Sequence, residues 1–227
     1  MADFYVMMGV GRSGGWMMTN GDTATGMVSA LAVLALQSAH GGPFTFALAA
    51  GECITITGES GSGKTVMLRM IADLDPHEGD AQVDGKACSA MPADRWRRLV
   101  QYVPAEPAWW SDVVTDHMAD TDEVRDLVVR LGLRTDCLRT PLSRLSTGER
   151  QRLALIRAIR LNPRVLLLDE PCSALDGATT DKVETVLQAL RAQGVAIVLV
   201  SHNMRQAERM ADRQFQMRHG HLEEILA

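Results

Sequence analysis

The sequence predicts an α/β fold in which a mostly parallel β-sheet carries an antiparallel β flank and a short helical subdomain. Two continuous apolar runs, at residues 165–168 and 195–200, have the length of strands and suit strands covered on both faces. Between them, apolar residues recur over 183–190 with the i, i+3, i+4, i+7 spacing of a helix. The dipeptide Asp84-Gly85 marks a tight hairpin, so antiparallel pairing is expected in the N-terminal part.

The other elements follow from the same periodicities. Four earlier apolar runs of strand length predict strands at residues 30–36, 44–48, 52–57 and 99–103. Helical stretches are expected at residues 66–72, 123–131 and 151–161. Residues 107–145 lack long apolar runs, and we expect them to form the helical subdomain from short helices and loops. Residues 1–26 have no sustained period and predict a flexible N-terminal extension, ahead of one domain over 27–227.

The composition is that of an ordinary globular protein. Apolar residues make up 46% of the 227 positions and charged residues 22%. A net charge of −5 argues against a nucleic-acid partner, because phosphate neutralisation requires a basic surface. The longest apolar run, at residues 27–36, is about half the ~20 residues that span a bilayer. Four scattered cysteines without a CxxC pair predict reduced thiols and a cytoplasmic location.

The strongest motif is GESGSGKT, which directly follows the apolar strand ending at Thr57 and precedes a helix. Its glycines allow backbone N–H groups to wrap a phosphate, and the helix N-terminus adds a positive dipole. Lys64 is expected to reach the β- and γ-phosphates, and the Thr65 hydroxyl to bind Mg²⁺. The predicted nucleotide-binding residues of the motif are Gly58, Glu59, Ser60, Gly61, Ser62, Gly63, Lys64 and Thr65.

A second motif ends the apolar run at 165–168 with two carboxylates, Asp169 and Glu170. Carboxylates at the end of a buried strand are costly unless they have a task. Asp169 is predicted to hold Mg²⁺ together with Thr65, and Glu170 to polarise the attacking water. These two motifs predict a P-loop NTPase fold, and they leave kinases, helicases and GTPases open.

A third motif, Leu145-Ser-Thr-Gly-Glu-Arg-Gln-Arg152, lies about twenty residues before Asp169. With Ser173-Ala-Leu-Asp176 and Ser201-His202 it resembles the ATP-binding cassette (ABC) family, over roughly residues 30 to 225. The resemblance implies an ATP-hydrolysing subunit that drives a membrane permease on a separate chain, at the inner face of the cell membrane. It also implies a homodimer around two ATP molecules.

In that dimer, the resemblance implies that Ser146 and Gly148 approach the γ-phosphate bound by the other subunit. It implies that His202 holds the γ-phosphate and the attacking water. Two other classes remain open: a soluble, non-transport ABC ATPase, and a regulatory cassette with weak turnover. The transported substrate and the direction of transport lie outside what these motifs specify.

Several positions depart from the family pattern. Ala105 stands where the family has a glutamine that touches Mg²⁺ and water, and we do not expect the neighbouring Glu106 to replace it, because successive extended residues point to opposite sides. The usual aromatic residue that stacks on adenine is missing, which leaves Gln37 and His40 as candidates. Thr147 replaces a glycine, which would matter if that position needed a positive φ.

Trp109 and Trp110 stand out in a chain with 4% aromatic residues. Two interpretations are open. They could anchor a contact with the permease, since tryptophan is enriched at the centre of interfaces. Alternatively, one or both could pack inside the helical subdomain.

Overall fold

The structure is a computed structural model that describes residues 29–225, so the expected extension over 1–26 lies outside the described residues. A six-stranded sheet forms its centre, in the order β10-β9-β3-β8-β7-β6. Its strands are β3 (Cys53–Thr57), β6 (Val100–Val103), β7 (Val165–Asp169), β8 (Ala196–Val200), β9 (Arg213–Arg218) and β10 (His221–Ile225). The five neighbouring strands β9, β3, β8, β7 and β6 pair in parallel, and β10 pairs antiparallel with β9 at the edge.

Every residue of β3, β7 and β8 is buried. Burial on both faces explains why the sequence reads as continuous apolar runs in β7 and β8. Because both faces of these strands are covered, polar residues at alternate positions would be buried in one of the two packed layers. The mostly parallel sheet predicted from these runs is therefore confirmed.

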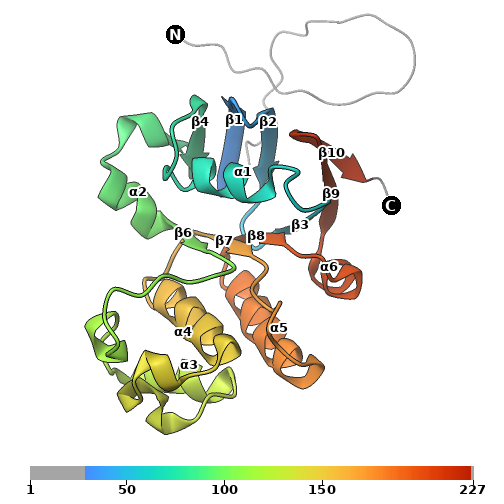
Figure 1. The fold of residues 1–227 in the computed structure, drawn as a ribbon. Helices are drawn as coiled ribbons and strands as arrows, with labels where there is room; N and C mark the ends of the chain where they lie inside the picture. Colours follow the sequence, from blue (N-terminus) through green and yellow to red (C-terminus); the bar gives the residue numbers. More distant parts are fainter. Residues whose placement is uncertain (1–28, 226–227) are drawn as a thin grey trace, which may run out of the picture.

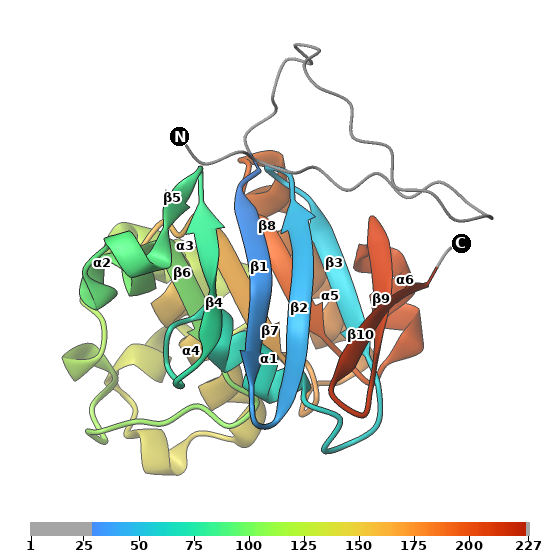
Figure 2. The same cartoon turned by 90° about the horizontal axis from the view of Figure 1, so that it is seen from above.

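A separate four-stranded antiparallel sheet, in the order β2-β1-β4-β5, forms the predicted flank. Its strands are β1 (Leu31–Ser38), β2 (Gly41–Leu48), β4 (Glu78–Val83) and β5 (Lys86–Ala87). Asp84 and Gly85 form the turn between β4 and β5, as expected, and both have positive φ values. Figure 2 shows this sheet in front of the central one.

Helix α1 (Lys64–Ile71) lies between the two sheets and buries Met67, Leu68 and Ile71 against both. Beside it, α2 (Ala93–Leu99) contributes Trp96, which is fully buried and donates from its indole N–H to Ile71 O at 2.9 Å. The polar end of this tryptophan is thus satisfied inside the core. Trp96 fixes the helix that leads into β6.

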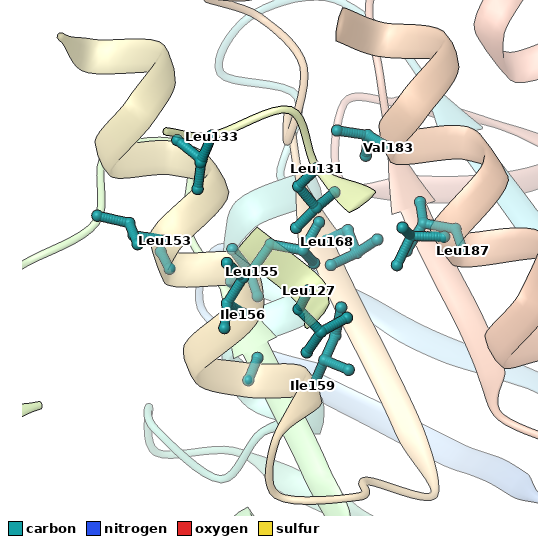
Figure 3. Packing of buried hydrophobic residues seen from close by; sticks show 14 of the residues in the cluster. Leu127, Leu131, Leu133, Leu153, Leu155, Ile156, Ile159, Leu168, Val183 and Leu187 are labelled. Atoms are coloured by element: carbon teal, nitrogen blue, oxygen red, sulfur yellow. The ribbon is translucent and has the colours of Figure 1, made fainter. Parts of the chain in front are cut away.

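The third layer holds the helices on the other side of the central sheet (Figure 1). It contains α3 (Asp122–Arg130), α4 (Thr147–Ile159) and α5 (Gly177–Ala192), and α6 (Met204–Met210) lies beside β3. Short 3₁₀ turns complete it at Val114–Asp116, Thr135–Arg139 and Leu142–Arg144, and a further one, Cys88–Ala90, precedes α2. Figure 3 shows the apolar side chains of α3, α4, β7 and α5 meeting in one cluster.

The stretch 107–145 therefore consists of short helices and turns, as its composition indicated, and its buried residues share a core with α4 and α5. Its boundaries as a subdomain stay a prediction. Within residues 29–225, none of the helices combines the length and apolar character that crossing a bilayer requires.

The carboxyl ends of four neighbouring parallel strands, β3, β8, β7 and β6, lie at one edge of the central sheet. In open α/β sheets, ligands bind in the crevice outside these ends. The loops that leave this edge carry the phosphate-loop motif, His202, Asp169-Glu170 and Ala105. Strand order thus brings together motifs that are far apart in the sequence.

Candidate functional site

The loop between β3 and α1 depends on glycine for its course. Gly58 and Gly63 have φ values of 147° and 111°, in the region that favours glycine. A Cβ atom at Gly58 would lie 2.3 Å from Met217 O on β9, which is a severe clash. Gly63 is the N-cap of α1, so the loop delivers its last backbone groups to the start of that helix.

Lys64 folds back over this loop and is buried. Its ammonium group donates hydrogen bonds of 2.7 Å to Gly58 O and to Glu59 O. Burial lowers the pKa of Lys64, and the negative charges of Glu170 and Asp169 act in the opposite direction. The ammonium group thus lies among backbone oxygens and beside two carboxylates. A phosphate group bound in the loop would attract it strongly.

Thr65 and Asp169 meet across the crevice. The Thr65 hydroxyl donates to Asp169 Oδ2 at 2.7 Å, and the Tyr102 hydroxyl from β6 donates to the same oxygen at 3.2 Å. Asp169 is 4% exposed. Burial and the neighbouring carboxylate raise the pKa of Tyr102, so it remains a hydroxyl donor at neutral pH. A hydroxyl and a carboxylate oxygen side by side are the ligand chemistry that Mg²⁺ takes in proteins, so these residues fit the ion.

Glu170 and His202 form the second polar pair of the crevice. His202 Nε2 lies 3.3 Å from Glu170 Oε1, and the His202 backbone N–H donates to Glu170 Oε2 at 3.2 Å. Glu170 Oε1 is buried and accepts no hydrogen bond within the described part of the chain. Burial raises the pKa of Glu170, although the His202 N–H lowers it. A desolvated carboxylate with a raised pKa is suited to accept a proton.

The backbone of Glu170 is itself unusual, because its φ of 50° lies in the left-handed region. Its N–H donates to Val200 O at 3.0 Å on the neighbouring strand. Non-glycine residues in this region concentrate at functional sites, where the surroundings hold them. No residue pattern around position 170 predicted this conformation.

One cavity of about 380 Å³ collects most of the predicted site residues. Its predicted members are Ser60, Gly61, Gly63, Lys64, Thr65, Asp169, Glu170 and His202. The other three loop residues, Gly58, Glu59 and Ser62, instead line a neighbouring hollow of about 400 Å³ against β9. Ser146 and Gly148 line neither cavity.

Ser146 and Gly148 lie instead at the start of α4. Ser146 is exposed and caps this helix by accepting from the Glu149 backbone N–H at 3.2 Å. Gly148 is buried against the loop after β7, where a Cβ atom would lie 2.8 Å from Leu175 Cδ2 and 3.0 Å from Ala174 O. Glycine at this position therefore allows the start of α4 and that loop to pack in contact.

Thr147 and Glu149 of the third motif both fit this helix start. Thr147 is the first residue of α4 and lies outside the left-handed region, so the concern about a positive φ does not apply. Glu149 accepts from the Ser146 backbone N–H at 2.8 Å, which completes a capping box and lowers the pKa of Glu149. The helix start therefore carries an ionised carboxylate at neutral pH.

Ala105 lines the cavity beside Glu170, whereas Glu106 is exposed and does not line it. This confirms that Glu106 does not take the place of the missing glutamine. Gln151 of α4, which sequence reasoning missed, contacts the backbone of Ala105 and Glu170. Its amide donates to Ala105 O at 3.2 Å and to Glu170 O at 2.9 Å. The sequence signal that could have identified Gln151 is its position, as a polar residue, on the apolar face of the helix.

A larger cavity of about 780 Å³ adjoins the first one, with which it shares His40 and Val66. Gln37 also lines it, so both candidates for base contact lie beside the phosphate loop. Its remaining walls include Asp75 and His77, and no Phe, Tyr or Trp lines it among the described residues. The cavity thus offers imidazole and amide groups in place of an aromatic stacking partner.

Trp109 and Trp110 have different environments. Trp109 packs against the core of the helical layer, with the Arg157 guanidinium 4.4 Å from its ring centroid. Trp110 is 73% exposed, and its ring centroid lies 3.8 Å from that of His117. The two residues therefore differ: Trp109 is half-buried and packs against the helical layer, and Trp110 presents its surface to solvent.

The comparisons with known proteins agree with this geometry. The family model described as ABC transporter matches residues 42–173. The chain is 34% identical over 170 residues to the probable iron export ATP-binding protein FetA of Escherichia coli, covering 70% of this chain and 76% of FetA. It is 33% identical over 187 residues to the aliphatic sulfonates import ATP-binding protein SsuB 2 of Agrobacterium fabrum, covering 76% of this chain and 68% of SsuB 2.

Among solved structures, a bacterial Atm1-family ABC exporter with ATP bound matches with a TM-score of 0.77 at 21% identity. That match covers 91% of this chain and 40% of the exporter chain, and at this identity it supports the fold alone. The family match covers the phosphate loop, α4 and the strand that ends at Asp169. The chain therefore belongs to the ABC transporter family, as one of its ATP-binding, ATP-hydrolysing cassettes.

Proposed function

We propose that this cassette dimerises head to tail around two ATP molecules and drives a membrane permease carried on a separate chain. The carrying observation is that its functional residues occupy two separate places. Lys64, Thr65, Asp169 and Glu170 line one cavity, while Ser146 presents an exposed hydroxyl at a helix start outside it. A second copy can supply the missing helix N-terminus, as a head-to-tail pair would.

Within each cavity, the phosphate loop and Lys64 would bind the β- and γ-phosphates. Thr65 and Asp169 would hold Mg²⁺, which neutralises charge on the phosphates when bound. Glu170 would accept the proton of the attacking water, and His202, 3.3 Å away, would orient that water and the γ-phosphate. Ser146 and Gly148 of the second copy would then donate to the γ-phosphate from the opposite side.

The permease contact is proposed for the surface around Trp110. This exposed indole lies five residues after Ala105, which lines the cavity. An exposed tryptophan beside the loop of a catalytic cavity suits an interface that senses the state of that cavity. This arrangement would place the cassette in the cytoplasm, on the inner face of the cell membrane.

A mixing experiment tests the composite site. Lys64→Ala removes the phosphate-loop cation, and Ser146→Arg blocks the helix start, so each variant alone should lack turnover. Mixed together, they should recover about a quarter of wild-type ATP turnover, since half of randomly formed dimers are mixed and each keeps one intact site of two. Residual activity that merely equals the average of the two separate variants would contradict head-to-tail dimerisation.

A second experiment tests the partner. The tagged chain is extracted from its native membranes in gentle detergent, and co-purifying proteins are identified by mass spectrometry. One stoichiometric multi-helix protein is expected, and its yield should fall in Trp110→Ala but not in the matched Val129→Ala, which removes another exposed apolar side chain. Recovery of ribosomes, nucleic acid or no partner would favour the soluble or regulatory alternatives.

A further inference from the structure

Gln151 joins three motifs through a single side chain. It is 2% exposed and lies on the first turns of α4. Its Nε2 group lies within hydrogen-bond distance of three acceptors, Glu170 O at 2.9 Å, Ser173 Oγ at 3.1 Å and Ala105 O at 3.2 Å, which share its two hydrogens. These acceptors come from the loop after β6, the end of β7 and the turn that follows β7.

The direction of the Gln151 amide is determined by its surroundings. The carbonyl oxygens of Ala105 and Glu170 can only accept, so the amide must present its N–H₂ group to them. Its own oxygen, Oε1, is buried without a partner within residues 29–225. An unpaired buried oxygen costs about as much free energy as a lost hydrogen bond. The contacts of Nε2 must offset that cost for the side chain to keep this orientation.

The main chain of Glu170 is the most consequential of these contacts. Its left-handed φ of 50° persists only if neighbouring groups hold it. The Glu170 N–H is held by Val200 O, and its carbonyl accepts from Gln151 and from the Ser173 N–H at 3.2 Å. Gln151 is the contact among these that comes from α4, the helix whose first turn carries Ser146 and Gly148.

We propose that Gln151 is a positioning residue, which fixes the Glu170 main chain and the Ala105 loop to α4 and thereby aims the Glu170 carboxylate. The proposal rests on the function proposed above. Because position 105 has no side-chain amide, the link from this loop to the cavity runs through the Ala105 carbonyl and Gln151. A shift of α4 against a second subunit would reach Glu170 through the same amide.

The test compares Gln151→Met, which keeps length without a donor, with Gln151→Asn, which keeps a shortened amide. Gln188→Met, on the exposed face of α5, is the matched control. Turnover is measured against ATP concentration with the purified full chain. Gln151→Met should lower kcat by about tenfold while KM for ATP changes less than about twofold, because the phosphate-loop contacts stay intact. Gln151→Asn should fall between Gln151→Met and the wild type.

An unchanged kcat in a folded Gln151→Met overturns the proposal, as does a rise in KM that accounts for the whole loss. If Gln151→Met does not fold, Gln151→Asn decides by the same criteria. If neither folds, Gln151 acts on stability and the proposal is wrong.

Failure of the proposed function gives a different result. In that case wild-type turnover is absent or survives in Glu170→Gln, so nothing remains for Gln151 to position. If the wild type is active and Glu170→Gln is inactive, the behaviour of Gln151→Met concerns the positioning proposal alone.

Discussion

The Thr65 hydroxyl donates a 2.7 Å hydrogen bond to Asp169 Oδ2, joining two residues that lie 104 positions apart in the chain. The contact places a hydroxyl and a carboxylate oxygen at the carboxyl ends of β3 and β7. Between these strands lies β8, which delivers His202 to the same cavity.

The Thr65 hydroxyl is predicted to set the Mg²⁺ requirement. Thr65→Val keeps the shape of the side chain but removes the oxygen, so half-maximal turnover should need at least about ten times more Mg²⁺. Thr65→Ser keeps the hydroxyl and should stay close to the wild type. The measurement is ATP turnover in a Mg²⁺ titration, and equal half-saturation points for the two variants would contradict the assignment.

Glu170 is predicted to reduce stability at neutral pH. Burial raises its folded pKa above the ordinary value near 4.5, so the carboxyl ionises at lower pH in the unfolded chain than in the folded one. The folded state therefore loses stability relative to the unfolded state as pH rises from the unfolded pKa through the folded pKa. Glu170→Gln should therefore raise Tm at pH 7 while abolishing turnover. The gain should shrink below about pH 4, where the carboxyl is protonated in both states.

Thermal unfolding of the wild type and Glu170→Gln at pH 4 and pH 7 measures this difference. Glu149→Gln is the contrasting variant, because the Ser146 backbone N–H lowers the folded pKa of Glu149. The contribution of Glu149 is present above its unfolded pKa and lost as pH falls through the folded one, so Glu149→Gln should lower Tm at pH 7. A lower Tm in Glu170→Gln at pH 7 would show that desolvation does not dominate at that site.

The two tryptophans are predicted to differ in stability. Trp109 is half-buried and packs against the core of the helical layer, so Trp109→Ala should lower the free energy of unfolding by about 2 kcal/mol. Trp110 is 73% exposed, so Trp110→Ala should change it by less than about 0.5 kcal/mol. Urea denaturation of the two variants gives both values, and equal losses would place the indoles in similar environments.

Ala105 is predicted to change how hydrolysis is coupled rather than to prevent it. Ala105→Gln adds an amide at a position that lines the cavity beside Glu170, so turnover should change by several-fold, either alone or with the permease. Glu106→Gln, at the exposed neighbour, is the control and should have no effect. If Ala105→Gln alters neither basal nor permease-stimulated turnover, the missing glutamine has no bearing on coupling.

Much of the fold could be predicted because its signals are local. The buried strands β7 and β8 are apolar at nearly every position, and the phosphate loop has glycines where the backbone takes a positive φ. In both cases the chemistry of neighbouring residues already restricts the conformation. The antiparallel flank followed in the same way from Asp84-Gly85.

The sequence by itself thus determined the α/β class, the phosphate loop and the identity of the polar residues at the strand ends. Tertiary structure alone decided which of them meet: the Thr65–Asp169 contact, the separation of Ser146 from the cavity, and the division between Trp109 and Trp110. It also decided the left-handed Glu170 and its contact with Gln151. These depend on strand order and helix packing, which bring distant segments together, and no local propensity encodes such contacts.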